Sequence, residues 1–196
     1  MKNIQLFLAI VFLLIIACNK VVQNNNTDVL DGQYVEKNNN GIITVIGNFN
    51  NGERDGQFMY FDTKGKLQTQ ENYVKNKLHD IQITVHNTGK INKSINYANG
   101  IKEGEYQIYY KTGKLQETGS YKNGKKDGEI IWYYETGQKN IVYNYVNGQL
   151  NGPTQEFSKE GDLIKEGLYI NGQKQESPNR GTIQHAYWIN FEKDNH

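Results

Sequence analysis

The sequence lacks most of the residues from which a thick globular core or a disulfide framework is built. Only one of its 196 residues is cysteine and two are proline, and hydrophobic residues make up 36%, below the roughly 45–50% of typical globular chains. A single cysteine excludes an intramolecular disulfide and a cysteine-based metal cage. The low apolar content argues against a two-layered core, so stability must come from strand pairing and side-chain stacking.

An excess of charge of one sign is also absent. The chain has 22 Lys and Arg against 21 Asp and Glu, and removal of residues 1–17 deletes only Lys2, which leaves 21 minus 21, or zero. Nucleic-acid-binding proteins normally carry a basic excess or a basic patch. The composition therefore predicts no nucleic-acid partner.

Aromatic residues and glycine are abundant instead. The chain is 12% aromatic and contains 20 glycines. Aromatic side chains suit a half-buried pleated surface, and glycine supplies the positive φ that tight turns need. This composition predicts many short strands joined by tight turns.

The first residues resemble the leader of a bacterial lipoprotein. An apolar run, Leu6 to Ala17, suits a signal peptide and is shorter than the about 20 residues that span a bilayer. The run leads into the motif Ile-Ile-Ala-Cys at residues 15–18, which is similar to the lipobox whose cysteine is acylated before cleavage. We predict a lipoprotein signal peptide over residues 1–17 and lipidation, with palmitate-type acyl chains, at Cys18. An uncleaved anchor and an ordinary secretory leader are the alternatives.

The segment that follows predicts a tether to a membrane. Residues 18–31 are rich in asparagine and have no useful periodicity, so we expect them to be flexible. The protein is then expected in the cell envelope, lipid-anchored to a bacterial membrane. Asn19 stands where an aspartate would favour inner-membrane retention, so the outer membrane or the cell surface is favoured over the inner membrane.

A repeat of 24 residues organises the rest of the chain. One glycine recurs at this spacing without insertion or deletion, as Gly41, Gly65, Gly89, Gly113, Gly137 and Gly161. Two further turn positions keep the same spacing, one with Asp80 and the other with Asn76 in place of glycine. Three turn positions in phase over residues 32–175 define six units with two strand-length stretches each. We predict an all-β fold, an elongated antiparallel β-hairpin repeat array of about twelve strands.

Apolar residues recur in three columns at the same spacing. The first column is Phe49, Tyr73, Tyr97, Tyr121, Tyr145 and Tyr169. The second column is Phe61, Val85, Tyr109, Tyr133 and Phe157. The third column is Ile43, Leu67, Ile91, Leu115 and Leu163, interrupted by Lys139. Members of the first and third columns lie six residues apart, an even separation that predicts one shared face. The aromatic ladder is expected to form a core shared between neighbouring hairpins.

The repeat pattern fails after Gly172, because Glu176 stands where a glycine is expected. An unprotected strand edge invites aggregation, so arrays of this kind need an end. Residues 176–196 are predicted to be a C-terminal cap and tail. Within them, the apolar-rich stretch Thr182 to Phe191 is expected to be a capping strand that closes the last hairpin.

The fifth unit resembles a known repeat family. Residues 121–128 place an aromatic residue before Asn-Gly-Lys and a second glycine, and residues 131–137 end a strand in paired aromatics and another glycine. This pattern is similar to the MORN-repeat variant of bacterial proteins, and the resemblance extends over residues 32–175. It implies an antiparallel β-array used in binding and scaffolding, and some bacterial members are described as antitoxins or immunity proteins. The third unit departs most from the pattern.

Residues that could carry chemistry are few. His79 and His86 lie seven residues apart along one expected strand, an odd separation that points them to opposite faces, so no metal site is predicted. Asp55, Glu103 and Asp127 recur just before a turn glycine, which favours a turn role over paired catalytic carboxylates. We predict no catalytic residue, no cofactor and no enzymatic activity.

Together these features lead to an expected function. A lipid anchor, a neutral charge and a regular array predict a membrane-anchored protein-binding repeat module whose partner is another protein, a toxin or an envelope component. The resemblance suggests an antitoxin or immunity-type role. The alternatives are a structural cell-envelope protein and one that contacts lipid or glycan. No motif marks a partner-binding face, so that face stays unassigned.

Overall fold

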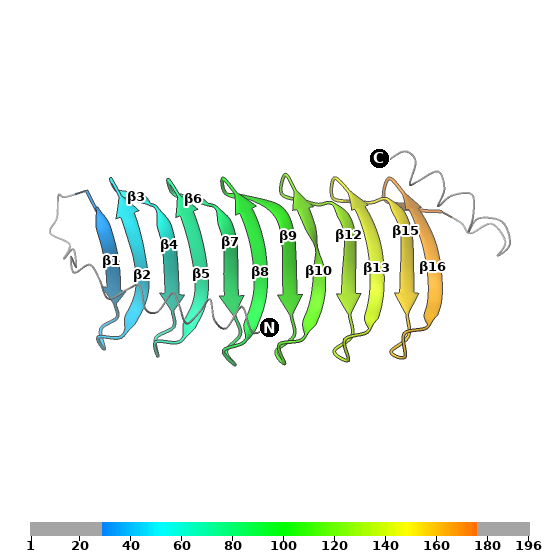
Figure 1. Ribbon diagram of the computed structural model, residues 1–196, viewed down its shortest axis with the longest axis horizontal. Coiled ribbons are helices and arrows are strands. Elements are labelled where there is room, and N and C mark those ends of the chain that lie inside the picture. The colour runs from blue at the N-terminus through cyan, green and yellow to red at the C-terminus, as the bar shows by residue number, and fades with distance from the viewer. Residues whose placement is uncertain (1–28, 176–196) are drawn as a thin grey trace.

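The computed structural model describes residues 29–175 as one open antiparallel sheet (Figure 1). The sheet has 17 strands, and these residues contain no helix. The strands lie side by side along the longest axis of the molecule, in chain order. The prediction of an all-β, elongated hairpin array is therefore confirmed. The predicted capping strand lies outside the described residues.

Twelve of the strands are six to nine residues long and form six hairpins. The first six are β1 (Gly32–Lys37), β2 (Ile43–Asn50), β4 (Gly56–Phe61), β5 (Leu67–Val74), β7 (Asp80–Val85) and β8 (Ile91–Ala98). The other six are β9 (Ile101–Tyr109), β10 (Leu115–Lys122), β12 (Gly128–Tyr133), β13 (Lys139–Val146), β15 (Gly152–Phe157) and β16 (Leu163–Ile170). Five further strands of two residues follow the turns, namely β3 (Glu53–Arg54), β6 (Lys77–Leu78), β11 (Lys125–Lys126), β14 (Gln149–Leu150) and β17 (Gln173–Lys174).

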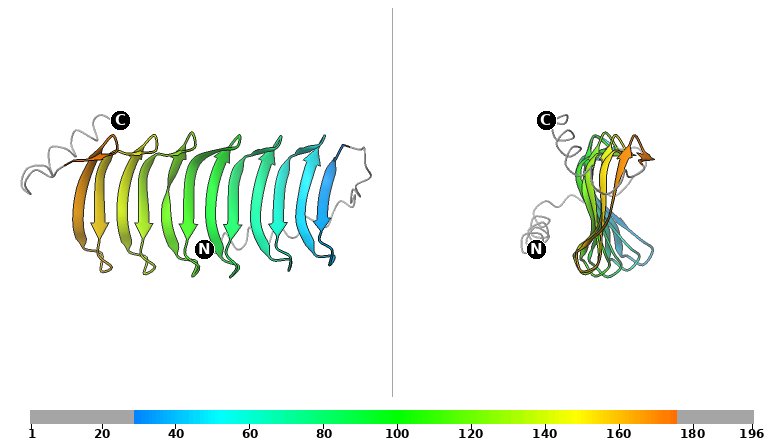
Figure 2. Two further views of the ribbon diagram at one scale, coloured as in Figure 1. Left: turned by 180° about the vertical axis from the view of Figure 1, so that it is seen from behind. Right: turned by 90° about the vertical axis from the view of Figure 1, so that its right-hand side faces the viewer.

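Each long strand pairs only with its neighbours in the chain. Within a hairpin the two strands pair directly, as β4 does with β5. Between hairpins the second strand pairs with the first strand of the next unit, as in the pairs β2–β4 and β13–β15. Seen down the long axis, the strands cross one another, which shows the accumulated twist of the sheet (Figure 2). The described residues therefore form a single twisted layer.

The turns between units adopt the backbone that their residues favour. Asn51 has φ 50° and Gly52 has φ 82°, the two positive values of a type I′ turn. The third unit keeps this conformation without glycine, since Lys75 has φ 48° and Asn76 has φ 65°. Asp80, also in place of glycine, has φ 58°. The predicted turn positions are confirmed, including those where glycine is replaced.

A β-bulge near the other turn of each hairpin corrects one prediction. In the second hairpin the register shifts so that Phe61 pairs with Leu67, which leaves an extra residue in β5. A bulge breaks the alternation of side chains along a strand. Leu67 therefore lies on the face of its partner Phe61, opposite to Tyr73. The prediction that the first and third apolar columns share a face was wrong, because it assumed an uninterrupted strand.

The pairing assigns the side chains to two faces with different character. The core face carries the first apolar column and the three largest fully buried side chains, Phe58, Tyr106 and Ile130. The opposite face is called here the amide face, after a column of asparagines at positions 48, 72, 96 and 144. Three of these side chains, at residues 48, 96 and 144, donate to the backbone oxygens of Asp55, Glu105 and Pro153, respectively.

Rings on the core face pack across hairpin boundaries. The ring of Phe58 lies edge-on to those of Phe49 and Tyr73, with centroids 5.4 and 5.3 Å apart. Ile95, Tyr106 and Ile130 form a second buried cluster that joins three hairpins. No hairpin buries these side chains by itself, so each unit depends on its neighbours. A core shared between neighbouring hairpins is confirmed. Of the predicted columns, however, only Tyr73 is buried, and the other buried hydrophobic side chains lie at positions that were not predicted from the sequence.

A second set of contacts links each turn to the preceding unit. The amide of Gly124 donates to the carbonyl of Lys102 at 2.9 Å, and Gly148 donates to Lys126 at 2.8 Å, in each case 22 residues earlier. The same bond joins Gly52 to Leu30, which sequence analysis had placed in the tether. Contacts of the array therefore begin before residue 32.

The residue before each strand-opening glycine completes this link. A carboxylate oxygen of Asp127 accepts the amide of Asn147 at 3.0 Å, and Glu103 accepts that of Asn123 at 2.7 Å. Asn151 accepts the amide of Asn171 at 3.2 Å in the same way. The predicted turn role of these residues is confirmed for Glu103 and Asp127. Asp55 differs, since its carboxylate accepts the Asn50 side chain at 3.4 Å.

Removing this acceptor should weaken the array modestly. We expect Asp127→Ala to lower the free energy of unfolding by about 1 kcal/mol, because the Asn147 amide loses its partner. Asp127→Asn keeps an acceptor oxygen, as Asn151 does naturally, and should cost under about 0.5 kcal/mol. Urea denaturation of both variants checks the difference. Equal losses would show that the charge and not the hydrogen bond matters.

Candidate functional site

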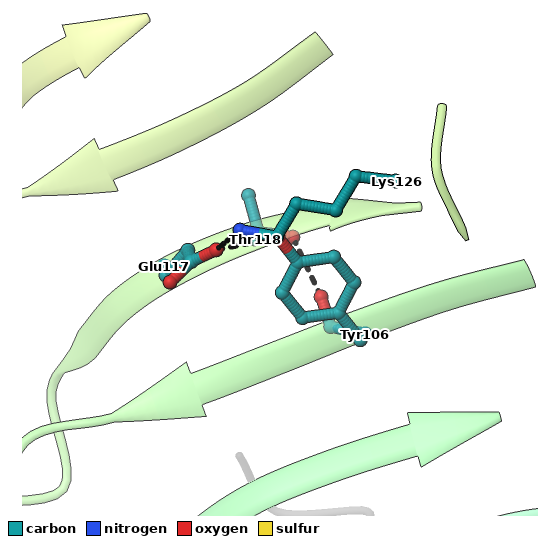
Figure 3. Close-up of polar contacts among 4 residues, drawn as sticks. All are labelled: Tyr106, Glu117, Thr118 and Lys126. Carbon is teal, nitrogen blue, oxygen red and sulfur yellow. Dashed lines mark hydrogen bonds and ion pairs between the residues drawn. The ribbon is translucent and has the colours of Figure 1, made fainter. Parts of the chain in front are cut away.

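The most buried polar cluster of the described residues lies in the middle of the core face (Figure 3). The hydroxyl of Tyr106 donates to a carboxylate oxygen of Glu117 at 2.5 Å, and the Lys126 ammonium contacts the same oxygen at 2.6 Å. On the opposite, amide face of the same strands, the hydroxyl of Thr118 donates to the backbone oxygen of Tyr106 at 3.2 Å. Strands β9, β10 and β11 supply these residues. The donors and the carboxylate satisfy one another, so the arrangement stabilises the sheet and offers no free nucleophile.

Aromatic rings surround the charged part of this cluster. The Lys126 ammonium lies 4.9 Å from the centre of the Trp132 ring, 5.6 Å from that of Tyr106 and 5.8 Å from that of Tyr145. Such contacts favour a cation over the ring faces. Glu117 is 8% exposed. The ion pair is therefore largely shielded from water.

The second hairpin has a related network. The Arg54 guanidinium lies over the Tyr73 ring at 4.6 Å and donates to the Tyr73 hydroxyl at 3.0 Å. The same hydroxyl donates to Glu71 at 2.5 Å. Glu71 also accepts the Gln82 side chain at 2.6 Å. Gln82 replaces an aromatic or aliphatic residue of other units, so the third unit makes the core face polar at this point.

Sequence reasoning missed the role of the cations. No role was assigned from the sequence to Lys126, whose ammonium is bound to Glu117 on the core face. Lys102 behaves alike and lies 4.9 Å from the centre of the Tyr121 ring. The available signal was a cation at one position of the 24-residue repeat in four units, as Arg54, Lys102, Lys126 and Lys174, with leucine at residues 78 and 150. Only repeat alignment could have separated these from the neighbouring lysines.

Burial alters the titration of the core-face tyrosines. Burial and then the hydrogen bond to Glu117 raise the pKa of Tyr106 above its ordinary value of 10.0. Burial and then the hydrogen bond to Glu71 likewise raise the pKa of Tyr73. Both hydroxyls thus remain protonated in the folded sheet at a pH where those of the unfolded chain ionise.

This difference predicts alkaline instability. Above about pH 10 the unfolded chain loses tyrosine protons that the folded chain retains, so the stability contributed by these groups is present below about pH 10 and is lost as pH rises further. We expect Tyr106→Phe to be less stable at neutral pH but to lose stability less steeply above about pH 10. Urea midpoints against pH measure the two slopes. Identical slopes would contradict the prediction.

His79 and His86 lie at opposite ends of β7. The Nδ1 atom of His79, before β7, lies 3.4 Å from the amide of Asn99, and the Nε2 atom of His86, after β7, lies 2.9 Å from the backbone oxygen of Tyr109. They therefore flank opposite ends of one strand. Over residues 29–175, no three His, Cys, Asp or Glu side chains gather as a metal site would require.

The predicted lipidation site, Cys18, and the signal peptide lie outside the described residues, as does most of the predicted tether. No helix within residues 29–175 is long and apolar enough to cross a membrane. The structure therefore leaves the anchor as a sequence-based prediction.

Comparison with known proteins supports the repeat assignment. The model of the MORN repeat variant matches residues 54–75, 102–123 and 126–147. These segments cover the second, fourth and fifth hairpins. The third hairpin, whose turns lack two glycines, is not among the matches. A search of curated proteins finds no significant match to the chain.

Proposed function

Since three units of the chain match the MORN repeat variant, we propose that it is a protein-binding repeat module held at the bacterial cell envelope by a lipid on Cys18. The repeat family suggests a role in binding. We propose in addition that the partner is a protein and that the chain lies in the cell envelope.

The observation that carries the proposal is the open, single-layered sheet. Large apolar side chains stay exposed on it, including Val74 at 42%, Ile101 at 52% and Val146 at 41%. Turns and bulges at fixed repeat positions hold the backbone in one conformation. A preordered surface of this kind loses little conformational entropy when it binds another protein.

An antitoxin or immunity-type role is the finer form of this proposal. It is motivated by the family resemblance together with the predicted leader, which would place the array where an incoming toxin arrives. The neutral overall charge fits a partner selected by shape and apolar contact more than by long-range attraction.

Crosslinking in cells tests the partner. The full chain, tagged at its C-terminus, is crosslinked in the native envelope and purified beside a matched Tyr109→Ser, Tyr133→Ser variant. We expect one protein to be enriched with the parent chain and reduced at least tenfold with the variant. The circular dichroism of the variant controls for folding. Absence of any enriched protein would overturn the proposal.

The anchor requires its own test. We expect metabolically supplied palmitate to label the full chain and Cys18→Ser to abolish both the labelling and the membrane association. Asn19→Asp is a matched control that keeps the thiol and should retain the label. Labelling of the Cys18→Ser chain would exclude lipidation at this residue.

Glycan contact is the second candidate, and one observation favours it. Tyr109, Tyr133 and Phe157 recur one unit apart on the amide face, a spacing of about 10 Å, or two strands. Rings in a row at this spacing suit an extended sugar polymer. Sedimentation of the full chain with purified peptidoglycan, compared with the Tyr109→Ser, Tyr133→Ser variant, would separate this candidate from a protein partner.

A further inference from the structure

The interior of the amide face carries no charged residue over the first half of the array, whereas Glu53, Lys77 and the carboxylates of Asp55 and Asp80 lie along its edge at the Asn-Gly turns. On the five neighbouring strands β2, β4, β5, β7 and β8, three positions per strand that pair within a hairpin point to this face, which makes fifteen. None of the fifteen side chains is charged, although 22% of the chain is charged and about three charges would be expected. None of them is buried. We call these fifteen side chains the neutral platform.

The neutral platform is ordered in rows. The row nearest the Asn-Gly turns is mainly amide, with Asn48, Gln57, Asn72, Ile81 and Asn96. The row nearest the other turns is apolar throughout, with Ile43, Phe61, Leu67, Val85 and Ile91. The central row is mixed, and Gln70 lies at its middle on β5. The core face of the same strands is different, because it carries Glu71 and Lys93, with Arg54 beside them on β3.

We propose that the neutral platform binds the neutral platform of a second copy of this chain, so that two single sheets form a face-to-face sandwich. A two-fold axis parallel to the strands sets each row against itself. Apolar side chains then meet apolar ones, and amides, which both donate and accept, meet amides. The absence of charge is what allows a surface to oppose itself, since like charges across an interface repel.

The available area fits such a dimer. Sheets stack about 10 Å apart with their strands nearly aligned. Eight strands from β1 to β10, at about 4.8 Å each and about 3.3 Å per residue over five residues, give a footprint of roughly 600 Å² per copy. Because side chains project from the sheet, the accessible area is larger than this flat footprint. It approaches the value of about 800 Å² per partner that a standard interface buries. On the three flanking strands of this area, Lys37 and Glu105 are the charged positions.

A pair of adjacent residues provides the test. Gln70 and Thr69 are neighbours in β5 that point to the amide face and the core face, respectively. Each is changed to cysteine in the full chain carrying Cys18→Ser, which makes the new thiol unique. With a short bifunctional thiol reagent, we expect Gln70→Cys to give crosslinked dimer and Thr69→Cys at least tenfold less. Equal crosslinking of the two would overturn the proposal.

The mass of the protein in solution, measured for variants with an added charge, tests the same interface. In mild detergent at micromolar concentration, light scattering of the parent full chain is expected to give the mass of two copies. Gln70→Glu brings two carboxylates together near the axis and should weaken the dimer at least about tenfold. Gln149→Glu, on the same face outside the neutral platform, should leave the mass unchanged. A single-copy mass for the parent chain would contradict the proposal, whatever other partner the protein binds.

Discussion

Replacing Gly47 with alanine is expected to lower the free energy of unfolding by about 3 kcal/mol, a large fraction of the total for a chain of this size. A Cβ atom at residue 47 would lie 2.2 Å from the Phe58 ring. Phe58 is 2% exposed and is held between the rings of Phe49 and Tyr73, so it has no room to move. Denaturation in urea measures the loss.

Two other glycines calibrate this result. Gly119 and Gly167 occupy the same repeat position as Gly47. A Cβ atom would lie 2.2 Å from the Ile130 side chain at residue 119, but 2.9 Å from the Thr154 hydroxyl at residue 167. We expect Gly119→Ala to cost about as much as Gly47→Ala and Gly167→Ala about 1 kcal/mol. Equal effects at all three positions would indicate that backbone freedom, and not space, sets the cost.

Removing the Glu117 carboxylate is the second change with a large expected effect. Glu117→Ala leaves the Lys126 ammonium without its ion-pair partner and the Tyr106 hydroxyl without its acceptor. Breaking a fully buried pair costs about 3–5 kcal/mol. The Lys126 side chain retains 27% exposure, so we expect a smaller loss of about 2 kcal/mol in the free energy of unfolding.

Two variants control this experiment. Glu117→Gln keeps an acceptor for Tyr106 but removes the charge, so it should cost about 1 kcal/mol. Glu156→Ala removes the partner of Lys165 from an exposed pair 3.9 Å apart, and should change stability by under about 0.5 kcal/mol. If Glu117→Ala changes stability as little as Glu156→Ala does, the ion pair contributes little to the free energy of unfolding. The aromatic rings around Lys126 would then be enough to stabilise its ammonium.

The fold was predictable because its signals are local. Turn glycines at fixed spacing, and the asparagines beside them, specify the backbone without reference to distant residues. Even Asp80 could be assigned to a left-handed turn from its repeat position. The order of the strands followed at once, since each hairpin has only its neighbours to pair with.

The arrangement on the faces could not be predicted equally well. A single bulge residue in β5 moves Leu67 to the other face, and bulges leave little trace in composition. The ion pair of Lys126 with Glu117 depends on the register between two strands. That register could not be predicted from the sequence. Asp127 was assigned correctly to a turn because it stands beside its glycine, whereas its bond to Asn147 required the structure.

Because each hairpin touches only the units before and after it, the array has no fixed length built into its contacts. In-frame duplication or loss of 24 codons would add or remove one hairpin unit and leave the other interfaces between hairpins intact. A lineage could thus lengthen or shorten the array by one repeat unit at a time without redesigning the sheet.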